Sequence, residues 1–159
     1  LNDGRLKFKF TDQLLDEVIA EALRHISRKH DDYKIVTDCE ELVLARMDVR
    51  LIIQVLVNLI DNAIKYTPEG GKVQLKVEKY SSFVKVDVID DGIGIKKEEI
   101  PKIFGRFYRS LSVADQPGVG IGLFLAREII QAQKGYIKVT SEREKGSIFS
   151  VFLPISKKE

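Results

Sequence analysis

The stretch Asn58-Leu59-Ile60-Asp61-Asn62-Ala63-Ile64-Lys65-Tyr66 decides the fold of this chain. It closes a segment that begins near Asp48, a residue type favoured at helix N-caps. At about 100° per residue, one broad arc of the predicted helix is apolar and contains Leu51, Ile52, Val55, Leu56, Leu59, Ile60 and Ala63. Asn58, Asn62 and Lys65 lie on the other arc, on neighbouring turns. Because asparagine is a mediocre helix former, the pair favours groups that hold a ligand; a solvated polar edge is the alternative.

Composition limits the class of protein. A length of 159 residues suits one domain, and 44% hydrophobic with 31% charged residues allows a sizeable core. The 26 basic and 24 acidic residues are well mixed and give a formal net charge of +2, so no basic stripe indicates nucleic acid. No apolar run approaches the roughly 18–20 residues of a membrane-spanning helix. A single cysteine, Cys39, excludes an intrachain disulfide.

Hydrophobic periodicity predicts interleaved strands and helices. Alternation predicts a strand over 5–10, after which Thr11 would begin a helix as its N-cap. Further predicted strands cover 34–37, 42–46, 72–80, 83–89, 136–141 and 147–153. Further predicted helices are the long one from Asp48, a short one over 97–104 and one over 121–134, which Gly135 would end as its C′ residue. Because most neighbouring strands form hairpins and alternate in hydropathy, we expect an α/β fold: a two-layer sandwich whose mixed, mostly antiparallel sheet is covered on one face by three main helices.

Two glycine-rich stretches add candidate binding groups. Asp90-Asp91-Gly92-Ile93-Gly94-Ile95 directly follows a predicted strand. Its carboxylate suits the amino group of a base, and its glycines let the backbone approach a flat ring; an ordinary turn is the alternative. Gly118-Val119-Gly120-Ile121-Gly122-Leu123 precedes a helix, where backbone N–H groups and the helix dipole suit an anion. Its spacing fits neither a Walker loop nor the dinucleotide-binding fingerprint.

Taken in order, these motifs resemble the catalytic, ATP-binding domain of sensor histidine kinases, in the superfamily that includes gyrase, Hsp90 and MutL. The order is Asn-x₃-Asn-x₂-Lys, Asp-x-Gly-x-Gly, Phe104-Gly105-Arg106-Phe107-Tyr108-Arg109 and Gly-x-Gly-x-Gly-Leu, and the similarity runs from about residue 5 to 154. The resemblance implies the Bergerat-type ATP-binding fold. It also leads us to expect that residues 1–159 are a single catalytic domain, without the dimerisation, phosphoacceptor and sensor domains.

The resemblance also implies roles for individual residues. Asn62 would ligate Mg²⁺, Lys65 would reach a phosphate, and Asp90 would accept from the exocyclic amine of adenine, so that ATP is preferred over GTP. Asn58, Lys65 and Arg109 would be catalytic, with Arg109 near the γ-phosphate. The other implied ATP contacts are Tyr66, Gly92, Ile93, Gly94, Ile95, Phe107, Tyr108, Gly118, Val119, Gly120, Ile121, Gly122 and Leu123. Residues 108–118 would form a lid over ATP. For Phe104 and Phe107 a place in the core is the favoured alternative.

Position 58 separates branches of this superfamily. Hydrolysing members carry Glu there as a general base, whereas the neutral amide of Asn58 accepts no proton at physiological pH. This favours transfer to a separate histidine, because neither His25 nor His30 lies in a phosphoacceptor-like motif. The expected partners are a phosphoacceptor and dimerisation domain of the same protein and a downstream response regulator, with no nucleic acid and no direct membrane contact. We expect a cytoplasmic domain, whose parent protein the sequence leaves free to be membrane-anchored.

Two departures from the family pattern keep other functions open. Val119 stands where many members have Thr or Ser, and Gly105 replaces an acidic residue. The alternatives are a hydrolysing ATPase or chaperone module, which Asn58 disfavours, and a non-enzymatic nucleotide-binding or interaction module. The intact Asn62 and Asp90 argue against the latter.

Overall fold

A computed structural model describes residues 7–26, 34–38, 42–67, 71–105, 119–142 and 145–156. Its helices are α1 (Leu15–Ile26), α2 (Val49–Tyr66) and α3 (Val119–Ala132), with a short 3-10 helix η1 (Ile100–Lys102). Its strands are β1 (Thr11–Leu14), β2 (Lys34–Asp38), β3 (Leu44–Met47), β4 (Lys72–Lys79), β5 (Phe83–Asp90), β6 (Tyr136–Glu142) and β7 (Gly146–Pro154). None of the helices in these ranges is long and apolar enough to cross a membrane.

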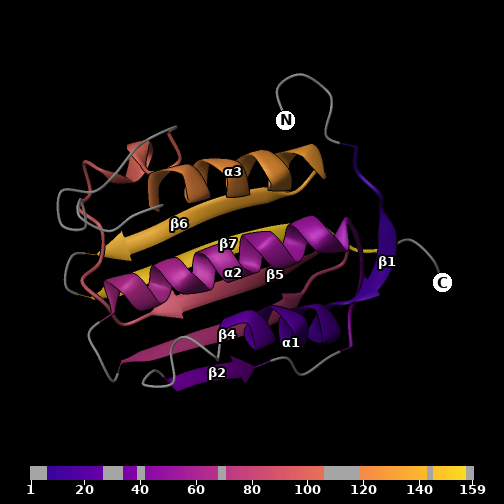
Figure 1. The fold of residues 1–159 in the computed structure, drawn as a ribbon, viewed down its shortest axis with the longest axis horizontal. Helices are drawn as coiled ribbons and strands as arrows, with labels where there is room; N and C mark the ends of the chain where they lie inside the picture. Colours follow the sequence, from indigo (N-terminus) through magenta and orange to yellow (C-terminus); the bar gives the residue numbers. More distant parts are fainter. Residues whose placement is uncertain are drawn as a thin grey trace.

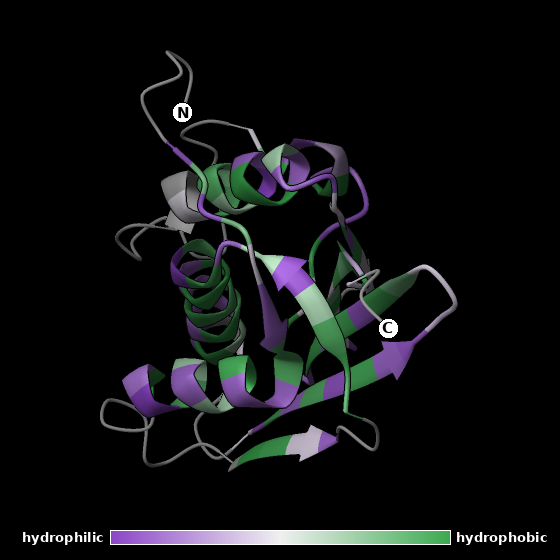
Figure 2. Cartoon of the chain, turned by 90° about the vertical axis from the view of Figure 1, so that its right-hand side faces the viewer, coloured by the Kyte–Doolittle hydropathy of each residue, from purple (hydrophilic) through white to green (hydrophobic). Residues whose placement is uncertain are grey.

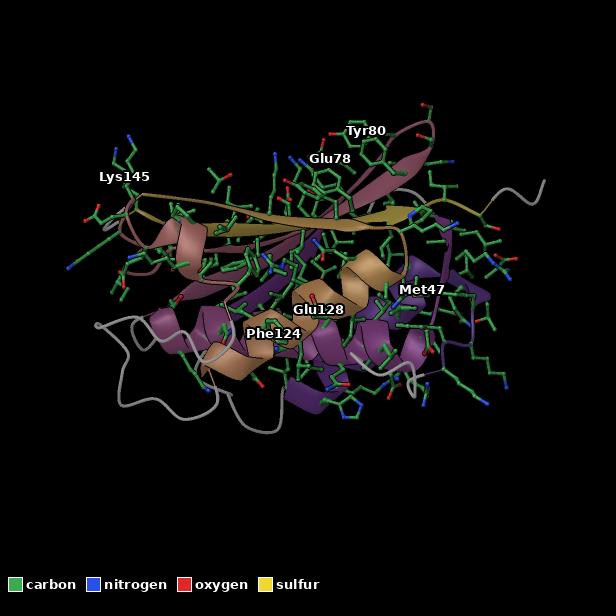
Figure 3. All side chains as sticks on the ribbon, turned by 90° about the horizontal axis from the view of Figure 1, so that it is seen from above. Met47, Glu78, Tyr80, Phe124, Glu128 and Lys145 are labelled. Atoms are coloured by element: carbon green, nitrogen blue, oxygen red, sulfur yellow. The ribbon has the colours of Figure 1, made fainter. Side chains whose placement is uncertain are left out.

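The described elements form two layers. Five strands make a sheet in the order β2-β4-β5-β7-β6, in which β2 and β4 run parallel and the other pairs antiparallel. Helices α1, α2 and α3 lie side by side on one face of this sheet (Figure 1). Figure 3 shows the same arrangement along the sheet, with the helices on one side only. The predicted two-layer sandwich and both predicted hairpins are confirmed.

The core lies between the two layers. In β5 alternate residues Val84, Val86 and Val88 face inward and are fully buried, and Leu59 and Ile60 of α2 are buried as well. The strands accordingly alternate between hydrophobic and hydrophilic residues (Figure 2). Since burial of apolar surface is the main favourable term in folding, this shared core holds α2 at a fixed place above β5.

The beginning of the chain differs from the prediction. Residues 7–10 form no strand, and 11–14 form strand β1 where a helix was expected, so that α1 begins at Leu15. β1 pairs antiparallel with β3, from Thr11 opposite Met47 to Leu14 opposite Leu44. This distant pairing supplies partners for the backbone groups of β1, and it overrides the local helical pattern. β3 itself begins two residues later than expected.

Helix α2 begins where predicted, but its cap works differently. Asp48 occupies the N-cap position without making a side-chain capping bond. Its carboxylate instead accepts from the backbone N–H of Lys9 at 2.9 Å and from Arg50 at 3.2 Å. Burial opposes the charged form, yet the Lys9 and Arg50 donors outweigh it and lower the pKa of Asp48. The residue therefore ties the incoming chain to the start of α2.

Two other helix boundaries need correction. The predicted helix over 97–104 is a turn followed by η1, with Pro101 inside η1. At the end of α3, Lys134 takes the left-handed conformation with φ 63°. Lys134 N–H donates to Gln131 O at 3.0 Å and Gly135 N–H to Ile130 O at 2.9 Å, which makes a Schellman motif. Gly135 is thus the C″ residue, and a Cβ there would lie 2.4 Å from the carbonyl oxygen of Phe152.

Candidate functional site

Apart from Asn58, which lies in the middle of α2, the sequence-predicted residues that the structure describes lie on parts of the chain that meet at one end of the molecule. Helix α2 ends there, α3 begins there, and β5 and β6 reach their last residues there, at the left of Figure 1. Helices α2 and α3 pack against each other, and α2 also packs on β5. The three motifs, far apart in the chain, therefore lie around one region.

The two asparagines of α2 differ in environment. Asn62 is 2% exposed, so a solvated polar edge does not describe it. Its Nδ2 atom finds no hydrogen-bond partner among the described residues. An unpaired buried polar group costs roughly 1–3 kcal/mol, and a ligand that pairs the amide would remove this cost. Lys65 is half-buried in the last turn of α2, and of Tyr66 the structure describes the backbone alone.

Asn58 lies in the contact between α2 and α3. A Cβ built on Gly122 would come within 2.5 Å of both Asn58 Nδ2 and Asn58 Oδ1. With the Asn58 side chain in this position, only a glycine at 122 lets the start of α3 approach it this closely. Gly122 has a packing role that its place in a glycine motif does not reveal. Leu123, another predicted contact, is a core residue with 2% exposure.

Asp90 is a buried carboxylate at the end of β5, with 3% exposure. Its Oδ1 accepts from the N–H of Gly92 at 2.9 Å, whereas Oδ2 is buried without a partner among the described residues. Burial raises the pKa of Asp90 to about 6, against the lowering effect of the Gly92 and Ser147 N–H groups and with a small further rise from Asp91. An acceptor with an unused oxygen in a dry place is suited to a donor on a ligand.

The loop after Asp90 turns sharply over the end of the sheet. Gly94 has φ 75°, a conformation that favours glycine. Ile93 is 39% exposed and Ile95 6% exposed, so the loop presents one apolar side chain outward and buries the next. Its backbone contacts include a hydrogen bond from Ile95 N–H to the hydroxyl of Ser141 at 2.8 Å. The sequence motif did not point to Ser141, which lies in another hairpin.

Several predicted residues cannot be placed. Phe107, Tyr108, Arg109 and Gly118 lie outside the described residues, as does the whole of the expected lid over 108–118. Val119, Gly120 and Ile121 form the start of α3, where the structure describes the backbone. Phe104 is in the core, as the favoured alternative had it: it makes an edge contact with Phe149, and the guanidinium carbon of Arg127 lies 5.7 Å from the centre of its ring.

An open groove of about 1070 Å³ runs between α1, α2 and α3 on the side away from the sheet. Asn58 and Gly122 border it, and apolar side chains such as Ile53, Val57 and Leu125 line it. The predicted catalytic Asn58 is thus reachable from the outer face of the helices.

Comparisons with known proteins agree with this fold. Residues 47–157 match the family described as histidine kinase-, DNA gyrase B-, and HSP90-like ATPase. The chain is 35% identical over 156 residues to the sensor protein KdpD of Clostridium acetobutylicum, covering 96% of this chain and 17% of that protein. It is 42% identical over 145 residues to the adaptive-response sensory kinase SasA of Thermosynechococcus vestitus, covering 90% and 38%. The solved catalytic domain of histidine kinase ThkA superposes with a TM-score of 0.77 at 34% identity, covering 92% of this chain and 96% of that one.

The chain therefore belongs to the family of histidine kinase-, DNA gyrase B- and HSP90-like ATPases. Within that family it is an ATP-binding catalytic domain of the histidine kinase type. It spans less than half the length of the two curated relatives named above.

Proposed function

We propose that this domain binds Mg²⁺-ATP at the end of the sheet and transfers the γ-phosphoryl group to a histidine on a separate dimerisation domain of the same protein. A response regulator would then receive the phosphoryl group. The observation that supports this most directly is the carboxylate of Asp90, which is buried at the end of β5 with one oxygen unpaired among the described residues.

The chemistry of Asp90 favours adenine. Its free oxygen accepts a hydrogen bond from an amino group, which adenine carries at the position where guanine carries an oxygen. The adjacent loop, with its glycines at 92 and 94, leaves room for a flat ring. Guanine would place two acceptors face to face in a buried site, so ATP is the preferred nucleotide.

Asn62 is the proposed ligand of Mg²⁺. An amide oxygen is a hard, neutral ligand, and Mg²⁺ commonly takes one or two protein oxygens with waters and phosphate oxygens. Asn62 is buried near the end of α2, and its Nδ2, which has no partner among the described residues, could donate to a phosphate oxygen while Oδ1 ligates the ion. When bound, the ion would neutralise charge on the phosphates. Lys65, one turn further on, would contact a phosphate, and Arg109 would face the transferring group.

The presence of asparagine at position 58 favours a histidine imidazole as the acceptor of the phosphoryl group. Water or a hydroxyl must lose a proton to attack phosphorus, and a neutral amide cannot take it. A neutral imidazole attacks with a lone pair that it already has, forming the N–P bond as the bond to the ADP oxygen breaks. The groove beside Asn58 offers an approach for a helix that carries such a histidine.

Titration calorimetry with ATP, with and without Mg²⁺, tests nucleotide binding. Losing a charge-assisted hydrogen bond costs roughly 1.5–3 kcal/mol, so Asp90→Ala should weaken ATP binding about ten- to a hundredfold. Asp91→Ala is the matched control, because this neighbouring carboxylate is exposed, and it should change affinity less than threefold. Absence of ATP binding by the wild-type chain would contradict the proposal and favour a non-enzymatic module.

Radiolabelled γ-phosphate tests the transfer. The chain alone should form no acid-labile phosphohistidine, and label should appear on the dimerisation domain of the parent protein when that domain is added. Steady release of inorganic phosphate without transfer would favour a hydrolysing ATPase.

A further inference from the structure

A row of three polar residues crosses the sheet at the end where β5 stops. Asp90 in β5 is paired with Ser147 in β7, and Ser147 is paired with Ser141 in β6. Directly opposed residues of antiparallel strands point to the same face. Asp90 and Ser147 are each 3% exposed, so this row lies on the inner face, under the helices.

The hydroxyl of Ser141 uses all of its hydrogen-bonding capacity. It accepts from Ile95 N–H at 2.8 Å, donates to Gly146 O at 2.9 Å and lies 2.8 Å from the hydroxyl of Ser147. A hydroxyl has one proton and two lone pairs. With its proton on Gly146 O, it accepts from Ile95 and Ser147, and no site remains for a ligand. Ser141 is therefore an anchor for protein groups.

The loop that follows Asp90 is held at both ends. Gly92 N–H donates to Asp90 at 2.9 Å, and Ile95 N–H donates to Ser141 at 2.8 Å. Because β7 lies between β5 and β6 in the sheet, the loop spans the end of β7. Gly94, with φ 75°, makes the turn between the two anchors.

The hairpin that carries Ser141 also closes on Asp90 directly. A Cβ on Gly146, which has φ 91°, would lie 2.0 Å from the carbonyl oxygen of Asp90. The backbone N–H of the next residue, Ser147, lies near enough to the Asp90 carboxylate to lower its pKa. The position of the β6–β7 hairpin therefore sets the surroundings of Asp90 and, through Ser141, the place of the loop.

We propose that Ser141 is a positioning residue for base recognition. Its hydroxyl fixes the backbone of residues 92–95 relative to Asp90, so that the loop and the carboxylate meet the same adenine ring. This inference rests on the proposed binding of ATP at Asp90. It names a residue that would determine the specificity of that site for adenine. Without the hydroxyl, Ile95 N–H loses its acceptor and the loop is anchored at one end only.

Calorimetric titration of ATP and GTP into four proteins tests the proposal: wild type, Ser141→Ala, Ser141→Thr and Ser150→Ala. Ser150→Ala is the matched control, since its buried hydroxyl donates to Asp87 at 2.6 Å on the opposite face of the same sheet. Ser141→Ala should raise the Kd for ATP roughly tenfold and the Kd for GTP less than threefold, because a misplaced loop affects the base most. Ser141→Thr keeps the hydroxyl and should stay within threefold of wild type, as should Ser150→Ala.

Amide hydrogen exchange of Ile95 in the nucleotide-free protein gives a readout that does not need ATP. Ser141→Ala should speed this exchange at least tenfold more than the exchange of the buried Val86 amide, which reports any loss of global stability. An unchanged ATP to GTP preference in Ser141→Ala, or an equal loss in Ser150→Ala, would overturn the inference. If the wild type bound no ATP, the proposed function would fail instead, and the two failures are thereby distinguishable.

Discussion

At the scale of single residues, Asp90 couples nucleotide binding to pH. Its pKa in the folded protein is about 6, because burial penalises the carboxylate. ATP binding needs the ionised form, which falls to about a tenth at one unit below the pKa. We expect the affinity for ATP to fall roughly tenfold between pH 7.5 and pH 5. Calorimetry at both values measures this, and Asp90→Asn corrects for titration of the ligand; an equal fall in that variant would remove Asp90 as the cause.

The same residue should destabilise the nucleotide-free protein at neutral pH. The folded-state pKa of Asp90 lies above the usual value of 3.8, so the folded protein binds the proton more tightly than the unfolded chain. Protonated Asp90 therefore adds to the free energy of unfolding. This contribution is complete below pH 3.8 and is lost as the pH rises through about 6. Asp90→Asn should therefore raise the urea midpoint at pH 7.5 and change it little at pH 4. A lower midpoint at pH 7.5 would show that the charge is not penalised.

Gly122 gives a second prediction at the residue scale. The Cβ of Gly122→Ala would meet the amide of Asn58 at 2.5 Å, so either that side chain or α3 must move. Displacing this half-buried amide costs more than the roughly 0.5–1 kcal/mol that Ala gains over Gly within a helix, so we expect a net loss of about 1 kcal/mol. Urea unfolding should show this loss, and the double variant Asn58→Ala/Gly122→Ala should regain more than half of it, because the obstructing amide is gone. Additive losses in the double variant would locate the strain elsewhere.

At the scale of elements, the end of α3 holds a residue in an unfavourable backbone conformation, so a substitution there can stabilise the protein. Lys134 adopts φ 63°, which a residue with a Cβ takes only at a cost. Lys134→Gly should raise the free energy of unfolding by roughly 0.5–1 kcal/mol. Gln131→Gly, at an exposed position within the last turn of the same helix, should lower it by about 1 kcal/mol. Urea unfolding compares the two, and destabilisation by both would mean that the left-handed position carries no strain.

The elements that sequence patterns predicted are those whose signals are local. Helix α2 repeats its apolar positions over five turns, and both hairpins alternate within one short window. The pairing of β1 with β3 escaped prediction because the paired residues lie thirty or more positions apart and share no motif. The nearby helical periodicity of α1 then extended wrongly over 11–14.

The residues of the candidate site also fall into those that a local motif identifies and those that only the folded structure identifies. Asp90 and the asparagines belong to compact motifs, so the sequence identifies them. Ser141 acts through the register of β6 against β7 and through a contact to Ile95 across 46 residues. No pattern around Ser141 shows this contact, because only the folded sheet creates it.

At the scale of the whole molecule, the two faces of the sheet have different character. Over β5 and β7 the inward-facing residues are apolar except for Asp90 and Ser147. The outer face carries Glu78 and Tyr80, which stand on the side away from the helices in Figure 3. It also holds an ion-pair chain in which Lys85 lies 3.3 Å from both Glu78 and Asp87. We therefore expect the nucleotide to bind on the helix-covered side of the sheet. Substitutions on the outer face serve as controls in the binding experiments.

A single core predicts that ATP bound at one end stabilises the whole domain. At an ATP concentration of about 100 times Kd, linkage adds about 2.7 kcal/mol to the free energy of unfolding. Amides in the centre of β5 and β7 lie in a common buried cluster and should exchange only on global unfolding. ATP with Mg²⁺ should slow the exchange of Val86 and Val151 about a hundredfold, and Asp90→Asn should reduce the effect at the same ATP concentration. Protection confined to residues 90–95 would instead mean that the site closes locally without support from the core.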